Sequence, residues 1–100
     1  MRIFDIQDSE GRVCAFEVSN FFFARLDVCG VVSRIPAARL IRKPKMFSSF
    51  REDEFCEFEV EGVKFVAWEP FGDNTRYWIG PEPPRWVPQI DAVREAFKRV

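Results

Sequence analysis

The tightest constraint on the fold of this chain is a segment of alternating residues near its middle. Apolar and acidic residues alternate without interruption in Cys-Glu-Phe-Glu-Val-Glu, residues 56–61. This two-residue period is typical of a β-strand with one buried and one solvated face. Glu61-Gly62 separates it from a second β-like segment, residues 63–69, and Gly permits the positive φ of a tight turn. We therefore predict a β-hairpin that turns at residues 61–62.

A turn at these two residues fixes the register of the hairpin. The apolar pairs on one face would be Cys56 with Ala67, Phe58 with Phe65, and Val60 with Val63. The pairs on the other face would be Phe55 with Trp68, Glu57 with Val66, and Glu59 with Lys64. Because a slip of one residue would mix the two sets, the pattern itself supports the register.

The residues after this hairpin predict a loop and a third strand. Residues 70–74, Pro-Phe-Gly-Asp-Asn, have the composition of a loop, and residues 75–79 are β-branched and aromatic. Gly80 to Pro84 should end that strand, because proline cannot donate a hydrogen bond to a sheet. Glu69 and Arg76 flank the loop, and we expect an ion pair between them at its neck.

A further hairpin is predicted at the start of the chain. Residues 2–7 and 12–19 both alternate, and the turn between them ends in Gly11, as in a three-residue loop with a bulge. This register places Asp8 beside Arg12, Ile6 opposite Cys14, and Phe4 opposite Phe16. Its predicted inner face consists of Phe4, Ile6, Cys14, Phe16 and Val18.

Two helices are expected, one in each half of the chain. Ser19 or Asn20 would cap a helix over residues 21–32, with Phe22, Leu26 and Cys29 on its buried face and Phe23 able to join them. The β-branched residues Val28, Val31 and Val32 favour a strand there instead, and Gly30 weakens both interpretations. Pro88 suits the first turn of a second helix. That helix should bury Ile90, Val93 and Phe97.

These elements predict an α+β fold in one domain, residues 1–100. With a short extended segment at residues 39–43, their order is β-β-α-β-β-β-β-α. The fold would be an antiparallel sheet of two β-hairpins plus extra strands, with the helices packed on one face.

The composition excludes several kinds of chemistry. The chain has no histidine and neither a GxxxxGK[ST] nor a GxGxxG loop, so the usual general base and the phosphate-binding loops are missing. Cys14, Cys29 and Cys56 are too widely spaced for a structural zinc site, and we interpret them as buried thiols in a reducing cytoplasm. We therefore expect a cytoplasmic protein without catalytic residues, metal or cofactor. The longest apolar segments have only four residues, for example Phe21 to Ala24, so no membrane span is expected.

The candidate functional surface is a group of aromatic and arginine side chains on the predicted meander and its exit. Trp, Tyr and Arg are enriched among binding hot spots. The candidate partner-binding residues are Phe55, Trp68, Arg76, Tyr77, Trp78, Arg85 and Trp86. The first hypothesis is a non-enzymatic module that binds a protein partner, or a second copy of itself as a homodimer, through this surface. The competing interpretation is that these rings form a second small core.

Two other functions compete with this hypothesis. The first is a small-ligand site in a Phe-lined pocket between sheet and helices, with Arg76 or Tyr77 supplying polarity. The second is binding of single-stranded nucleic acid by residues 39–51, which combine five basic side chains with Phe47 and Phe50. The net charge of −1 argues against nucleic acid, and basic residues on a short strand also protect a sheet edge.

Overall fold

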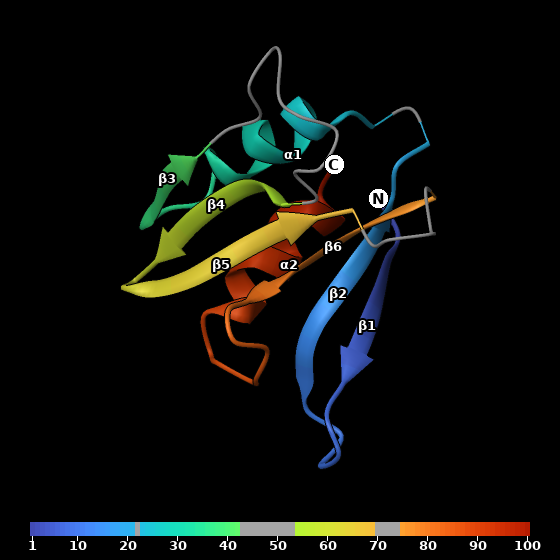
Figure 1. Ribbon diagram of the computed structural model, residues 1–100, viewed down its shortest axis with the longest axis vertical. Coiled ribbons are helices and arrows are strands. Elements are labelled where there is room, and N and C mark those ends of the chain that lie inside the picture. The colour runs from blue at the N-terminus through green and yellow to red at the C-terminus, as the bar shows by residue number, and fades with distance from the viewer. Residues whose placement is uncertain (22, 43–53, 70–74) are drawn as a thin grey trace.

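The computed structural model describes residues 1–21, 23–42, 54–69 and 75–100. Its elements are β1 (Ile3–Gln7), β2 (Val13–Ser19), α1 (Arg25–Val32), β3 (Ala38–Arg42), β4 (Glu54–Val60), β5 (Val63–Trp68), β6 (Arg76–Pro81) and α2 (Ile90–Lys98). The six strands form one antiparallel sheet in the order β1-β2-β6-β5-β4-β3. The predicted element order and fold class are confirmed (Figure 1).

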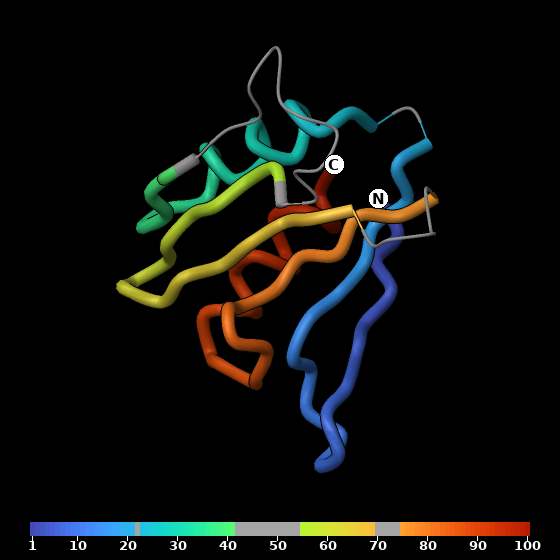
Figure 2. The backbone as a smooth tube through the Cα atoms, in the orientation of Figure 1, coloured from blue at the N-terminus to red at the C-terminus, as the bar shows by residue number. Residues whose placement is uncertain are grey.

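Two neighbouring strands of the sheet, β2 and β6, are far apart in the sequence. β2 pairs with β6, for example through Phe16 and Ile79, and Figure 2 shows the blue and orange parts of the chain running side by side. The N-terminal hairpin is thereby joined to the meander of β4, β5 and β6. The edge strands are β1 and β3, which confirms the prediction of a short edge strand near residues 39–43; Lys43 lies outside the described residues.

Both helices cover the same face of the sheet. α1 packs on β4 and β3, α2 packs on β2 and β1, and the two helices contact each other. The rings of Phe16, Phe58, Phe65 and Phe97 are fully buried in this layer. Phe58 and Phe65 stack with ring centroids 5.4 Å apart, and Phe16 meets Phe97 edge-on at 5.6 Å. These residues carry the main apolar core of the protein.

The central hairpin forms with the predicted turn and register. Glu61 and Gly62 both have positive φ, 51° and 81°, as a two-residue turn of this hand requires. The pairs from Cys56–Ala67 to Val60–Val63 are those predicted from the alternation. The prediction for Phe55 is wrong, because the register shifts between Glu54 and Cys56 and Glu54 takes the place opposite Trp68.

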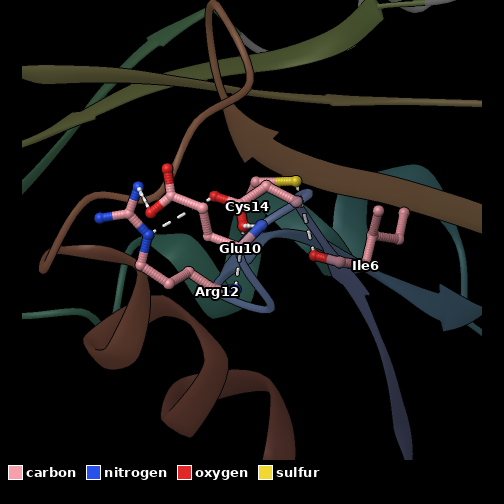
Figure 3. Close-up of polar contacts among 5 residues, drawn as sticks. Ile6, Glu10, Arg12 and Cys14 are labelled. Carbon is pink, nitrogen blue, oxygen red and sulfur yellow. Dashed lines mark hydrogen bonds and ion pairs between the residues drawn. The ribbon is translucent and has the colours of Figure 1, made fainter.

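The N-terminal hairpin follows the predicted register only near its turn. Asp8 N–H donates to the Arg12 carbonyl oxygen at 2.8 Å, and Gly11 has the positive φ of a bulged turn. Beyond the turn, Gln7 pairs with Val13 but Ile6 pairs with Ala15, which leaves Cys14 as the extra residue of a β-bulge. Figure 3 shows the Cys14 thiol directed at the Ile6 carbonyl oxygen, 3.5 Å away.

This bulge overturns part of the predicted inner face. Phe4 lies opposite Glu17, and Phe16 lies opposite Asp5, so Phe4 does not face Phe16. On β2 the core receives Phe16 and Val18, as predicted, whereas on β1 it receives Ile3. The predicted core positions of Phe4, Ile6 and Cys14 are therefore wrong. The physical reason is that one inserted residue exchanges the faces of all residues beyond it.

The first helix is shorter than predicted and turns a different face inward. It begins at Arg25, after Ala24, whose N–H donates to the Asp27 carboxylate at 2.7 Å; neither Ser19 nor Asn20 is its cap. The buried residues are Val28, Cys29, Val31 and Val32, and the Leu26 side chain is 64% exposed. The prediction for Leu26 is therefore wrong, whereas that for Cys29 is confirmed. Phe22 lies outside the described residues.

The C-terminal part of the chain agrees more closely with the prediction. α2 buries Ile90, Val93 and Phe97 completely. The strand predicted over residues 75–79 is β6, and it ends at Pro81, inside the predicted terminating segment Gly80 to Pro84. Pro81 pairs with β5, whereas the pairing of β6 with β2 ends at Ile79. The missing N–H of Pro81 therefore removes no hydrogen bond to β2. Within the described residues, no helix is long and apolar enough to span a membrane.

Candidate functional site

The face of the sheet opposite the helices carries a tryptophan pair at its centre. Trp68 on β5 and Trp78 on β6 are direct cross-strand partners, and their rings meet edge-on with centroids 6.0 Å apart. Both side chains are half-buried. Neither indole N–H forms a hydrogen bond within the part of the chain that the structure describes. A half-buried indole usually finds a hydrogen-bond acceptor, so these two donors remain available to a bound molecule.

A pocket of about 360 Å³ opens beside the tryptophan pair. Its lining consists of Val66, Trp68, Trp78, Pro81, Glu82 and Pro84. The lining is mainly aromatic, aliphatic and proline surface, with one carboxylate at Glu82. This volume is at the lower end of the range for small-molecule sites, roughly 300–1,000 Å³.

Gly80 explains how the Trp78 ring reaches this position. A Cβ atom at residue 80 would lie 2.8 Å from the Trp78 ring and 2.8 Å from the Ala15 Cβ atom. Both distances are shorter than real Cβ contacts allow. Ala15 itself is fully buried although it lies on the face away from the helices. The absence of a side chain at Gly80 therefore shapes the wall of the pocket.

The acidic and basic groups near the pocket are paired with each other. Lys64 Nζ lies 3.2 Å from a Glu82 oxygen and 3.3 Å from a Glu57 oxygen. The hydrogen bond to Glu82, and then the one to Glu57, raise the pKa of Lys64 above its ordinary value. Glu59, the direct cross-strand neighbour of Lys64, instead accepts from Arg39 at 2.9 Å. The carboxylate of Glu82 in the pocket lining is therefore already paired with a cation, Lys64.

A second group of aromatic and arginine side chains lies at the N-terminal hairpin. The Arg76 guanidinium lies 3.6 Å from the centroid of the Phe4 ring and forms an ion pair with Glu17 at 3.3 Å. Arg12 lies 5.6 Å from the centroid of the Trp86 ring. Cation–π contacts of this kind hold the arginines against the sheet. Trp86 remains 39% exposed.

The structure divides the predicted site residues between the two faces. Trp68, Arg76 and Trp78 lie on the face away from the helices, and Arg85 and Trp86 are exposed after β6. Phe55 and Tyr77 are buried in the core under the helices, 2% and 5% exposed, with their rings 5.0 Å apart. Their predicted place on the aromatic surface is therefore wrong.

The predicted ion pair at the loop neck is also wrong. Glu69 pairs with Arg25 of α1 at 3.2 Å, and Arg76 pairs with Glu17. Burial raises the pKa of Tyr77, and the Glu69 carboxylate adds to this increase. Loop residues 70–74 lie outside the described residues.

Sequence reasoning missed Phe4, Pro84 and Glu82. Phe4 was assigned to the core because the alternation carries no sign of the bulge at Cys14. Pro84 and Glu82 were interpreted only as part of a strand terminator. Most of the basic segment at residues 39–51 lies outside the described residues, and within the described part Arg39 is paired with Glu59.

No cluster of three or more metal-ligating side chains occurs among the residues that the structure describes.

No protein-family model matches the chain, and comparisons with curated proteins and with solved structures give no match.

Proposed function

We propose that the protein is a non-enzymatic interaction module that binds an extended, proline-containing segment of a partner protein across Trp68 and Trp78. The observation that carries the proposal is the pair of half-buried, edge-on indoles beside a pocket with proline walls. Aromatic-lined grooves recognise proline-rich segments because the polyproline II conformation is already formed before binding.

The hydrogen-bonding groups of such a segment complement those of the site. A polyproline II chain has no internal hydrogen bonds, so its carbonyl oxygens are available as acceptors. The indole N–H groups of Trp68 and Trp78 are donors without an acceptor in the described part of the chain. A proline-rich segment would accept these bonds and place its rings on the apolar lining of the pocket.

The charges near the pocket favour an uncharged segment. Lys64 already pairs with Glu82 and Glu57, so an acidic or basic partner would have to compete with these contacts. Apolar contact and the two indole donors would then supply most of the affinity. A single short groove of this kind corresponds to a weak or transient interface.

The other hypotheses receive less support. A Phe-lined ligand pocket between sheet and helices would occupy the space that Phe16, Phe58, Phe65 and Phe97 fill. A pocket of about 380 Å³ lies elsewhere, between α1 and α2, with Arg34 and Arg99 in its lining. Nucleic-acid binding would depend on residues 39–51, and Arg39 there is held by Glu59.

The proposal is tested with an acetylated and amidated decaproline peptide and a peptide of the same length with alternate prolines replaced by alanine. Binding is followed by indole fluorescence and by calorimetry. Trp78→Leu should weaken binding of decaproline at least about tenfold, as loss of a central hot-spot ring does. Leu26→Ala changes an exposed side chain on α1 and should leave binding unchanged.

Three outcomes would contradict this proposal. Equal affinity for both peptides would show that proline is not recognised, and unchanged affinity in Trp78→Leu would place binding elsewhere. Self-association of the wild type that Trp78→Leu abolishes would make a second copy of the chain the occupant. Sedimentation of both proteins without peptide distinguishes this last case.

A further inference from the structure

The two buried cysteines of the core lie in contact with each other. Cys29 on α1 and Cys56 on β4 have their Sγ atoms 2.9 Å apart, and their side chains are 4% and 0% exposed. An S–S bond is about 2.05 Å long. The Cys29 thiol donates a hydrogen bond to the Cys56 sulfur at this distance, which is longer than an S–S bond and shorter than the roughly 3.5–4.0 Å between packed carbon atoms.

The fold holds this pair together from two separate directions. Cys56 points inward because β4 alternates from residue 56 to residue 60, and Cys29 belongs to the buried face of α1 with Val28, Val31 and Val32. α1 packs directly on β4. The contact therefore joins elements that are 27 residues apart in the sequence.

We propose that Cys29 and Cys56 form an oxidation site, at which hydrogen peroxide converts two thiols into a disulfide that links α1 to β4. In the first step one thiol loses its proton, the thiolate sulfur attacks a peroxide oxygen and the O–O bond breaks. The departing hydroxide takes up the released proton, so the products are a sulfenic acid and water. In the second step the other thiol sulfur attacks the sulfenic sulfur and displaces the hydroxyl group as water. The two thiols lose two protons and two electrons, and one peroxide becomes two waters.

The burial of the pair selects the oxidant and the product. Hydrogen peroxide is small, and it reaches the sulfurs through brief local opening around α1, a helix of eight residues. Because the second thiol is already in contact with the first, the sulfenic acid is captured before a further peroxide oxidises it. Cys14 lies in the N-terminal hairpin, with its thiol directed at the Ile6 carbonyl oxygen, and takes no part.

The test uses the whole chain, reduced, desalted and then treated with hydrogen peroxide. The protein is denatured, alkylated with N-ethylmaleimide and analysed by intact mass and by peptide mapping. Before oxidation all three cysteines should carry the label. After oxidation only Cys14 should carry it, and a peptide cross-linked between Cys29 and Cys56 should appear without any covalent dimer.

The Cys14→Ser variant gives a second measurement that does not disturb the core. The disulfide closes a long loop in the unfolded chain, so peroxide should raise the thermal midpoint of this variant by roughly 10 °C or more, reversibly with dithiothreitol. Cys29→Ala and Cys56→Ala, where they fold, should not respond. Labelling of all three cysteines after peroxide, sulfinic acid at Cys29 or Cys56, or a disulfide that includes Cys14 would overturn the proposal.

Discussion

Replacement of Gly80 by alanine tests how closely the two halves of the sheet pack. The added Cβ atom would lie 2.8 Å from the Ala15 Cβ atom, 2.8 Å from the Trp78 ring and 3.2 Å from the Ala15 Cα atom. The ring of Trp78 can rotate away, but Ala15 is held by β2 between β1 and β6. The backbone of β2 or β6 must therefore move.

The size of the effect follows from two opposing contributions. Overpacking of a dense region costs about 1–3 kcal/mol. Removing a glycine from the unfolded chain offsets about 0.4–1 kcal/mol of that cost. At the midpoints of these two ranges the net destabilisation of Gly80→Ala is about 1.3 kcal/mol, which lowers the thermal midpoint of a domain of this size by roughly 5–10 °C.

Gly30→Ala is the matched control for this experiment. Gly30 lies inside α1, and a Cβ atom there would meet nothing within 4 Å. Alanine should stabilise that helix by roughly 0.5–1 kcal/mol. Both variants remove one glycine from the unfolded chain, so the difference between them reports mainly on the folded state. Thermal unfolding followed by circular dichroism would refute the packing argument if both variants shifted the midpoint equally and in the same direction.

Three further outcomes are expected. Phe97→Ala should cost about 3–5 kcal/mol in denaturant unfolding because the ring is fully buried, whereas Leu26→Ala should change little. The single tyrosine, Tyr77, should titrate by ultraviolet absorbance above its ordinary pKa because burial raises its pKa; its contribution to stability is present below pH ~10 and is lost as the pH rises through the folded-state pKa, and a midpoint at or below that of the unfolded chain would disprove this. The backbone N–H of Arg12, and then that of Glu10, lower the pKa of Asp8. Asp8 should therefore contribute to the stability of the wild type above pH ~4, and this contribution should be lost as the pH falls through the lowered pKa and be missing in Asp8→Ala. An identical dependence of stability on acid pH in both proteins would contradict this.

The parts of the fold that could be predicted are those in which the residue pattern is compatible with only one register or one buried face. The alternation at residues 56–61 and the turn at Glu61-Gly62 fix the central hairpin, and Ile90, Val93 and Phe97 fix the buried face of α2. A β-bulge cannot be predicted in this way, because the inserted residue leaves no mark in the alternation. Cys14 is inserted into an alternating strand, and residues on both sides of the insertion are apolar, so the sequence offers two acceptable registers.

The candidate site was predicted in part for the same reason. Trp68 and Trp78 follow from the meander and its alternation, and the structure pairs them. The alternation in β6 also places Tyr77 on the opposite face from Arg76 and Trp78, so the sequence itself carries the signal that Tyr77 is a core residue. The place of Phe55 depends on the irregularity at the start of β4, which no local pattern reveals.

The pairing of β2 with β6 determines the order in which the molecule can be assembled during synthesis. Phe16 leaves the ribosome 63 residues before its partner Ile79, so the N-terminal hairpin is made first and must wait for a neighbour. A lone two-stranded hairpin is at best marginally stable in water. Contacts between residues so distant in sequence slow folding. We expect the meander to form early and the pairing of β2 with β6 to form late. The unpaired edge of β2 is then open to chaperones until β6 has emerged from the ribosome.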